Sequence, residues 1–158
     1  MKDRAGGKEM ECREMTVIEQ FIERAEAVSA KVVRVHSDAE ADAVLARERE
    51  RAGASGFSVD VVRASRGIAS TGTCVVEADA EETRLAALLP EVSVIVLRAS
   101  DLVADLPDLA PYLRERQSAG RASYTSFITG PSRTADIERV SAVGVHGPLE
   151  LTIILVED

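Results

Sequence analysis

Three short segments of the chain combine glycines with hydroxyl, arginine or histidine side chains. We call them the first glycine loop (67–73, GIASTGT), the second glycine loop (130–136, GPSRTAD) and the third glycine loop (144–148, GVHGP). Glycines let the backbone turn sharply and leave amides free to bind an anion. Each loop lies beside a predicted strand, and ligands of open α/β sheets bind at strand ends. We therefore expect the three loops to meet and to bind something negatively charged, although each also fits an ordinary tight turn.

The second glycine loop carries the most specific pattern. The proline after its first glycine suits a first helical position, so the sequence predicts a turn and then a helix over 130–138. A helix start attracts negative charge, and Arg133 would add a bidentate donor for phosphate or carboxylate. In the alternative interpretation Ser132 or Thr134 only caps the helix, and Asp136 interacts with its positive end.

The third glycine loop contains His146, whose charge can change near neutral pH. It is a candidate acid or base, a ligand contact or only a turn residue. The chain has no Gly-x-Ser-x-Gly segment, no recognisable Cys/His pair and no Gly-x-Gly-x-x-Gly after a strand. His146 is therefore the candidate catalytic residue, and its role stays open. The candidate ligand-binding residues are Gly72, Thr73, Gly130, Ser132, Arg133, Thr134, Asp136, His146 and Gly147.

The composition restricts the class of protein. The chain has 158 residues, enough for one domain with its own core, and its net charge of -8 argues against nucleic-acid binding, which relies on clustered Lys and Arg. No apolar run approaches the roughly 18 residues of a membrane span, and residues 1–7 lack the apolar centre of a signal peptide. Cys12 and Cys74 lie far apart without metal-ligand spacing. We therefore expect no disulfide framework, no metal, no cofactor and a cytoplasmic location.

Local signals predict helices that alternate with strands. Capping signatures at Thr16 and Ser37 predict two helix starts. Further helices are predicted over 79–89 and, as two short helices because of their prolines, over 100–119. The predicted strands cover 31–36, 57–62, 73–77, 92–97, 123–129, 140–145 and 150–156, with a loop over 63–70.

This alternation is typical of βαβ units. The fold class is therefore α/β, with a mainly parallel sheet and helices on both of its faces. The short link between the last two strands predicts an antiparallel hairpin at one edge of the sheet. We expect residues 1–14 to be disordered and residues 15–158 to form a single domain.

Four stretches resemble the lactate-utilisation (LUD, LutC/YkgG-type) domain family. They are GIASTGT (67–73), RLAALLP (84–90), FITGPSRTADIE (127–138) and GVHGPLELTIILV (144–156), in the family's order and spacing. The resemblance implies a fold similar to the sugar-phosphate isomerase and CoA-transferase superfamily (NagB/RpiA/CoA-transferase-like). Ser70 stands where family members commonly have Glu, and the region 47–66 is shorter than usual.

The resemblance also implies a role in the oxidation of L-lactate to pyruvate. The chain would be a small subunit without a redox centre of its own, binding an anionic metabolite or iron–sulfur partner proteins. One alternative is a free-standing enzyme that acts on a phosphorylated or CoA-linked small molecule. Another is an interaction module whose glycine loops contact protein.

Overall fold

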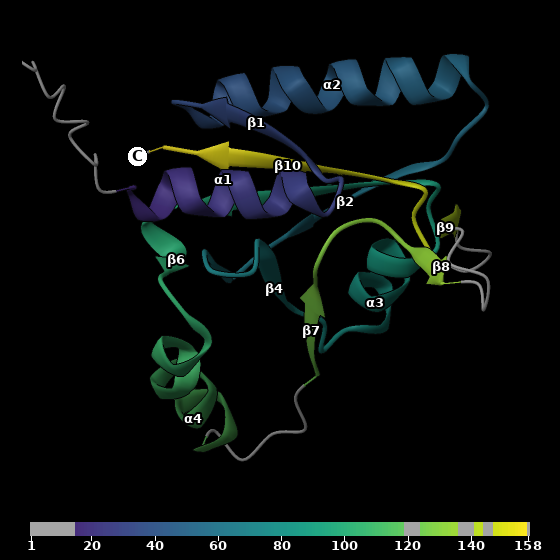
Figure 1. Cartoon of the computed structure of the whole chain (residues 1–158). Helices are drawn as coiled ribbons and strands as arrows, with labels where there is room; N and C mark the ends of the chain where they lie inside the picture. The colour runs from purple at the N-terminus through teal and green to yellow at the C-terminus, as the bar shows by residue number, and fades with distance from the viewer. Residues whose placement is uncertain (1–14, 119–123, 136–140, 144–146, 158) are drawn as a thin grey trace, which may run out of the picture.

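Four parallel strands form sheet A at the centre of the fold, in the order β1-β10-β5-β2. Each coincides with a predicted strand, and their bounds are β1 (Lys31–Val35), β10 (Glu150–Val156), β5 (Val92–Arg98) and β2 (Val59–Arg63). The computed structural model (Figure 1) describes residues 15–118, 124–135, 141–143 and 147–157. The segment 1–14, which we expect to be disordered, lies outside the described residues.

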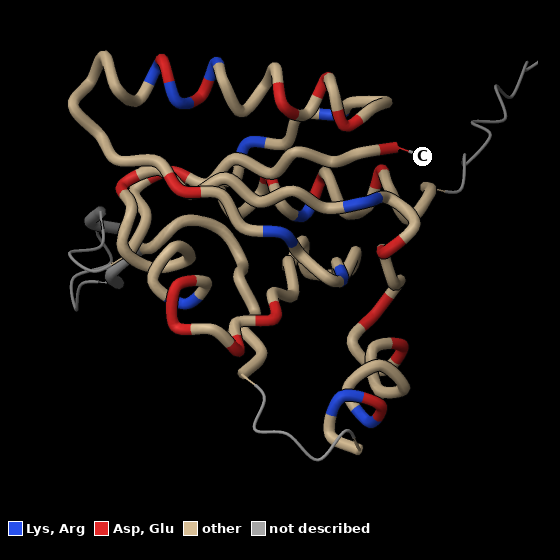
Figure 2. Tube along the Cα trace, turned by 180° about the vertical axis from the view of Figure 1, so that it is seen from behind, with Lys and Arg blue, Asp and Glu red and all other residues tan. Residues whose placement is uncertain are grey.

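Two helices cover opposite faces of sheet A (Figure 1). Helix α1 (Val17–Ala27) begins after Thr16, which exchanges hydrogen bonds with Glu19 in a complete capping box. Helix α2 (Asp38–Ala54) begins after Ser37, whose side chain accepts a backbone N–H of the first turn. Both predicted helix starts are confirmed. Figure 2 shows acidic and basic residues following one another along α2, as expected for a helix with a narrow buried stripe.

A second sheet, sheet B, packs on the α1 side of sheet A. Its strand order is β6-β3-β4-β7, with antiparallel pairs except for β3 and β6. The bounds are β6 (Leu102–Val103), β3 (Arg66–Ile68), β4 (Thr73–Glu77) and β7 (Thr125–Ile128). The sequence predicts a loop where β3 lies, and this prediction is wrong because β3 pairs with a neighbour on each side.

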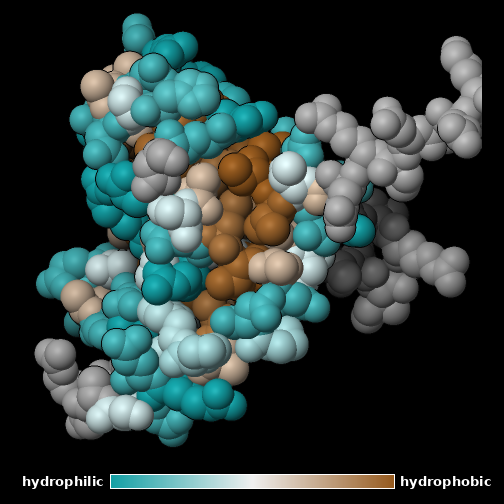
Figure 3. Space-filling model, turned by 90° about the vertical axis from the view of Figure 1, so that its left-hand side faces the viewer, coloured by the Kyte–Doolittle hydropathy of each residue, from teal (hydrophilic) through white to brown (hydrophobic). Residues whose placement is uncertain are grey.

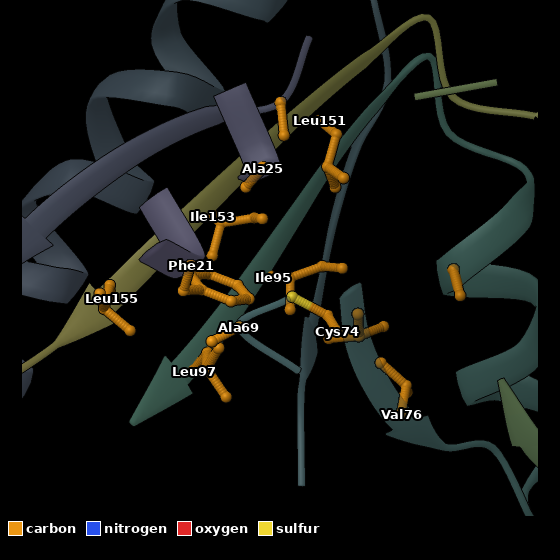
Figure 4. Packing of buried hydrophobic residues seen from close by; sticks show 13 residues of the cluster. Phe21, Ala25, Ala69, Cys74, Val76, Ile95, Leu97, Leu151, Ile153 and Leu155 are labelled. Carbon is orange, nitrogen blue, oxygen red and sulfur yellow. The ribbon is translucent and has the colours of Figure 1, made fainter. Parts of the chain in front are cut away.

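Alternate residues of sheet A fill two separate hydrophobic layers. Ile153 of β10 packs in the layer that contains Phe21 of α1, whereas Ile154 packs in the layer that contains Val44 of α2. Cys74 of β4 joins the first layer, so α1 and sheet B close it together (Figure 4). This period of two explains why strands covered on both faces are almost continuously apolar.

The remaining helices complete the layers. Helix α3 (Glu81–Leu88) contributes Ala87 to the first layer. The 3₁₀ helices η1 (Ala99–Asp101) and η2 (Leu106–Leu109) precede α4 (Ala110–Ser118), which packs on the outer face of sheet B. The two short helices predicted over 100–119 are confirmed only in part: η2 and α4 follow one another directly, and residues 102–103 form strand β6 and not a helix.

Polar contacts fix α4 to sheet B. The Tyr112 hydroxyl hydrogen-bonds to the Glu77 carboxylate and lies 2.8 Å from Ser65 Oγ. The Arg66 guanidinium lies 4.7 Å from the centre of the same tyrosine ring, and Arg116 forms an ion pair with Glu77. A single aromatic side chain therefore joins the helix to two charged groups of the sheet.

One carboxylate ties α2 to sheet A. The Glu48 side chain is 5% exposed and accepts hydrogen bonds from Lys31 Nζ at 2.6 Å and Arg51 Nη2 at 2.8 Å. Arg51 also pairs with Glu150 of β10. Burial alone would raise the pKa of Glu48, but the hydrogen bonds from the two cations outweigh it and hold the pKa below its ordinary value.

The C-terminal part of the fold differs from the prediction in two ways. Strand β9 (Ser141–Val143) pairs antiparallel with β8 (Arg133–Ala135) and not with β10, so the expected edge hairpin is wrong. Strand β10 lies inside sheet A because it is apolar on both faces and needs cover on both. The prediction of a helix over 130–138 is wrong at residues 133–135. These residues form β8, and their backbone pairs with that of β9.

None of the described helices is long and apolar enough to cross a membrane. Figure 3 shows one side of the molecule, on which hydrophobic residues gather in a central band between hydrophilic residues. The apolar surface on this side is therefore gathered into one area.

Candidate functional site

A pocket, which we call the interlayer pocket, opens between sheets A and B at the amino ends of β5 and β10. Its volume is about 340 Å³. Its polar side chains include Ser93, Thr129 and Ser132. Its apolar walls include Ala87, Leu88, Phe127, Ile128 and Leu151. Ligands of open α/β sheets usually bind at the carboxyl ends of the strands. This pocket lies at the other end because its mouth is formed by loops that follow β7 and precede β10.

The three glycine loops lie in one continuous region beside this pocket. In the first loop, Thr73 Oγ1 lies 2.7 Å from Thr129 Oγ1, directly before the second loop. The Ser132 amide of the second loop donates to the Pro148 carbonyl of the third loop at 2.8 Å. A Cβ placed on Gly147 would lie 2.9 Å from Ser132 Cβ. The expectation that the loops meet is confirmed for their described residues.

Two glycines allow the first and second loops to pack closely against the end of α1. Gly72 has φ +65, and a Cβ there would lie 2.3 Å from the Ala25 nitrogen. Gly130 has φ +74, and a Cβ there would lie 2.6 Å from the Val28 carbonyl oxygen. Both positions need the left-handed backbone and the close approach that only glycine allows. These two glycines therefore position the site through packing.

The free amides expected in these loops are partly occupied. The Ser70 amide donates to the Ala104 carbonyl at 3.0 Å, and the Ala69 amide donates to the Val103 carbonyl at 2.9 Å. The Ser132 amide is taken by the third loop. These three N–H groups cannot cradle an anion while they make these bonds, which corrects the expected mechanism.

Four of the predicted ligand-binding residues lie at or near the pocket. Gly130, Ser132 and Gly147 line it. Thr73 is buried and contacts the pocket only through its hydrogen bond to Thr129. Gly72 does not line the pocket and packs against α1. Whether these residues bind a ligand stays a prediction.

The other predicted residues are only partly described. Arg133 and Thr134 belong to β8, directly after the pocket-lining Ser132, and the structure describes the backbone alone for both. Asp136 and the candidate catalytic His146 lie outside the described residues.

Sequence reasoning missed Ser93, the second residue of β5. Its side chain is 1% exposed, and its Oγ has no hydrogen-bond partner in the described part of the chain. The signal available was one hydroxyl inside the apolar run VSVIVL. A buried hydroxyl without a partner is rare in folded proteins.

Ionisable groups contribute little to the described pocket. None of the described lining residues is charged. Burial raises the pKa of the nearby Cys74 thiol to about 12, so it stays protonated and is a poor nucleophile. Among the residues that the structure describes, no three His, Cys, Asp or Glu side chains are grouped to hold a metal ion.

Comparison with known proteins gives relatives in one family. Residues 61–156 match the model of the LUD domain. The chain is 40% identical over 102 residues to "Uncharacterized protein YkgG" of Escherichia coli (strain K12), a match that covers 63% of this chain and 44% of that protein. It is 38% identical over 92 residues to "Lactate utilization protein C" of Shouchella clausii (strain KSM-K16), covering 58% of this chain and 40% of that protein. The chain thus matches less than half the length of these relatives.

The fold is similar to that of a DUF162 family protein from Deinococcus radiodurans. The TM-score is 0.64, with 18% sequence identity, and the match covers 89% of this chain and 96% of that one. At this identity the likeness shows the fold alone, and it agrees with the predicted α/β class. The LUD match spans more than half of the chain and includes every described residue of the interlayer pocket. The chain therefore belongs to the LUD domain family.

Proposed function

We propose that the chain is a non-redox subunit of a system that oxidises L-lactate to pyruvate in the cytoplasm. The observation that carries this proposal is its similarity to proteins named Lactate utilization protein C, at 38% and 37% identity in two bacteria. The LUD match includes every described residue that lines the interlayer pocket, so the proposed binding site lies within the family domain.

The proposed role is binding and assembly, with the electrons carried elsewhere. An iron–sulfur cluster held by cysteines takes four thiolate ligands, whereas this chain has two cysteines. One of them, Cys74, is buried with a raised pKa. Iron–sulfur partner proteins would therefore supply the redox centres.

An anionic metabolite would bind at the mouth of the interlayer pocket. Arg133 directly follows Ser132, which lines the pocket, so it is the arginine nearest in sequence to the lining. A guanidinium is suited to a carboxylate or phosphate because it donates two parallel hydrogen bonds. We assign this contact to Arg133.

The test is capture from the native cells. A tagged chain should retain iron–sulfur proteins, and the captured complex should reduce an artificial electron acceptor when L-lactate is added. Deletion should abolish growth on L-lactate and leave growth on pyruvate unchanged. Recovery of the chain alone, together with normal growth of the deletion strain on L-lactate, would contradict the proposal.

The alternative is a free-standing enzyme for a phosphorylated or CoA-linked small molecule. The volume of about 340 Å³ favours it, because this lies within the roughly 300–1,000 Å³ of small-molecule sites. Thermal-shift screening of phosphates, nucleotides and acyl-CoAs tests it. A ligand found this way should lose about 1.5–3 kcal/mol of binding free energy in Arg133→Ala. If no compound of these classes raises the melting temperature, this alternative is wrong.

A further inference from the structure

A second pocket, which we call the α2 pocket, lies on the face of sheet A opposite the interlayer pocket. Helix α2 is the only described helix on this face (Figure 1). The four strands of sheet A, about 4.8 Å apart, form a surface wider than one helix of about 10 Å in diameter. The helix therefore leaves a hollow beside it, over β2 and β5, with a volume of about 270 Å³.

The α2 pocket lies toward the carboxyl ends of its strands, where ligands of open α/β sheets usually bind. Arg63 is the last residue of β2, and its register partner is Val96 near the end of β5. Both residues line the pocket. The lining residues from α2 precede residue 61, where the LUD match begins. The pocket therefore has the usual position of a ligand site and lies only partly within the family match.

The floor of the α2 pocket is apolar. It is formed by Ala41, Leu45, Val61 and Val96, which belong to the layer between α2 and sheet A. All but Ala41 are partly buried, so they remain within reach of a molecule in the pocket. The volume lies just below the roughly 300–1,000 Å³ of sites for drug-sized ligands. The floor therefore suits a small molecule with a hydrocarbon part.

Two opposite charges border this floor without pairing with each other. On α2, Asp42 lies between Ala41 and Leu45 on one helical stripe. On β2, Arg63 follows Val61 at the period of two that places both on the same face. Both charged side chains line the pocket, and neither has a hydrogen bond or an ion pair with another residue in the described part of the chain. The Asp42 carboxylate and the Arg63 guanidinium are therefore too far apart to pair directly.

The remaining charged residue of the lining already has a partner. Asp38 accepts hydrogen bonds from Arg98 Nη2 on both of its carboxylate oxygens, each at 3.1 Å. The α2 pocket thus presents one available negative group and one available positive group above an apolar floor. A ligand with a single charge would satisfy one of them and lie near the like charge of the other. A ligand that carries both charges satisfies both.

We propose that the α2 pocket binds a small aliphatic amino acid as its zwitterion. The ammonium group of the ligand donates to Asp42, and its carboxylate accepts two parallel hydrogen bonds from the Arg63 guanidinium. Its hydrocarbon side chain lies on Leu45 and Val61. This inference goes beyond the proposed function, because it concerns neither the interlayer pocket nor L-lactate.

The test is an NMR titration of the full chain with three compounds that share one carbon skeleton. L-valine carries both charges, isobutylamine is valine without the carboxylate, and 3-methylbutanoate is valine without the amine. L-valine should shift the amide signals of Leu45, Val61 and Val96. It should bind about threefold to fivefold more tightly than either of the other two, the value of one partly exposed ion pair.

Two variants remove the two charges separately. Asp42→Asn should weaken L-valine about threefold to fivefold without weakening 3-methylbutanoate, and Arg63→Gln should weaken L-valine equally without weakening isobutylamine. Both residues are exposed, so neither change disturbs the core. The matched controls are Glu50→Gln and Arg49→Gln, which neutralise one charge each on α2 outside the pocket and should leave L-valine binding unchanged.

Three results would overturn the inference. The first is the absence of shifts at the α2 pocket with L-valine. The second is binding of isobutylamine or 3-methylbutanoate as tightly as L-valine, which would show that one charge is enough. The third is an equal effect of the pocket variants and the control variants on L-valine binding. All three are measured on the purified chain, so they are independent of growth on L-lactate and of partner capture.

Discussion

The replacement of Gly130 by alanine tests whether the second glycine loop is held against α1. Gly130 has φ +74, and a Cβ there would lie 2.6 Å from the Val28 carbonyl oxygen. Gly56 has almost the same backbone angle, φ +77, but nothing lies within 4 Å of its Cβ position. The pair therefore separates the cost of the left-handed backbone from the cost of the overlap.

The magnitudes follow from these two costs. A left-handed alanine costs about 1–2 kcal/mol, which is the whole expected effect of Gly56→Ala. The overlap at Gly130 involves a backbone atom that cannot rotate away, and overpacking of this kind costs about 1–3 kcal/mol. Gly130→Ala should therefore lower the free energy of unfolding by about 2–5 kcal/mol in total.

Urea unfolding followed by circular dichroism measures these differences. Gly53→Ala is the control, because Gly53 lies in the last turn of α2 with open space around it. It should raise the free energy of unfolding by up to about 1 kcal/mol, through better helix propensity. If Gly130→Ala costs no more than Gly56→Ala, the loop moves freely away from α1 and the packing argument is wrong.

Three other predictions concern groups outside the loops. Glu48→Gln should cost about 1 kcal/mol at neutral pH, because Lys31 and Arg51 lose their anionic partner. Folding lowers the pKa of Glu48. The stability that its ion pairs add is therefore present above the unfolded pKa of about 4.3, and it is lost as the pH falls through the lower pKa of the folded state. The melting temperature of Glu48→Gln should therefore fall less steeply with decreasing pH than that of the unchanged protein. Parallel curves of melting temperature against pH for the two proteins would refute this. Cys74 should resist alkylation at pH 8 in the native protein and react in urea, as read by peptide mass spectrometry, because burial raises its pKa to about 12. Rapid native labelling of this peptide would contradict its burial. Tyr112→Phe should destabilise the chain by about 1–2 kcal/mol and speed amide exchange in α4, since the hydroxyl contact to the β4 carboxylate is lost. Unchanged exchange would show that α4 is held by its apolar residues alone.

The parts of the fold that could be predicted are those encoded by neighbouring residues. The capping signatures at Thr16 and Ser37 fix both helix starts because the groups that hydrogen-bond lie within one turn of each other. The apolar run of β5 indicates a strand covered on both faces, and it occupies an interior position in sheet A. In these cases short-range chemistry and long-range packing agree.

The parts that could not be predicted depend on distant partners. The proline and hydroxyl residues around β8 fit a helix start, and only pairing with β9 makes this segment a strand. The position of Ser93 can be read from the sequence, but its lack of a partner depends on residues from β10, α3 and β7. The loops could be found by residue type, whereas the walls of the pocket could not.

The position of β10 has a consequence for the order in which the protein folds. It follows every other described element along the chain, yet β1 and β5 pair with it and not with each other. During synthesis the ribosome releases β1 and β5 long before the strand that joins them. Until β10 emerges, the two carry unpaired backbone edges and uncovered apolar faces, which are the features that favour aggregation of nascent chains. A ribosome-associated chaperone that shields these strands would therefore raise the yield of folded protein. A stop codon before β10 would leave β1 separated from the pair formed by β5 and β2.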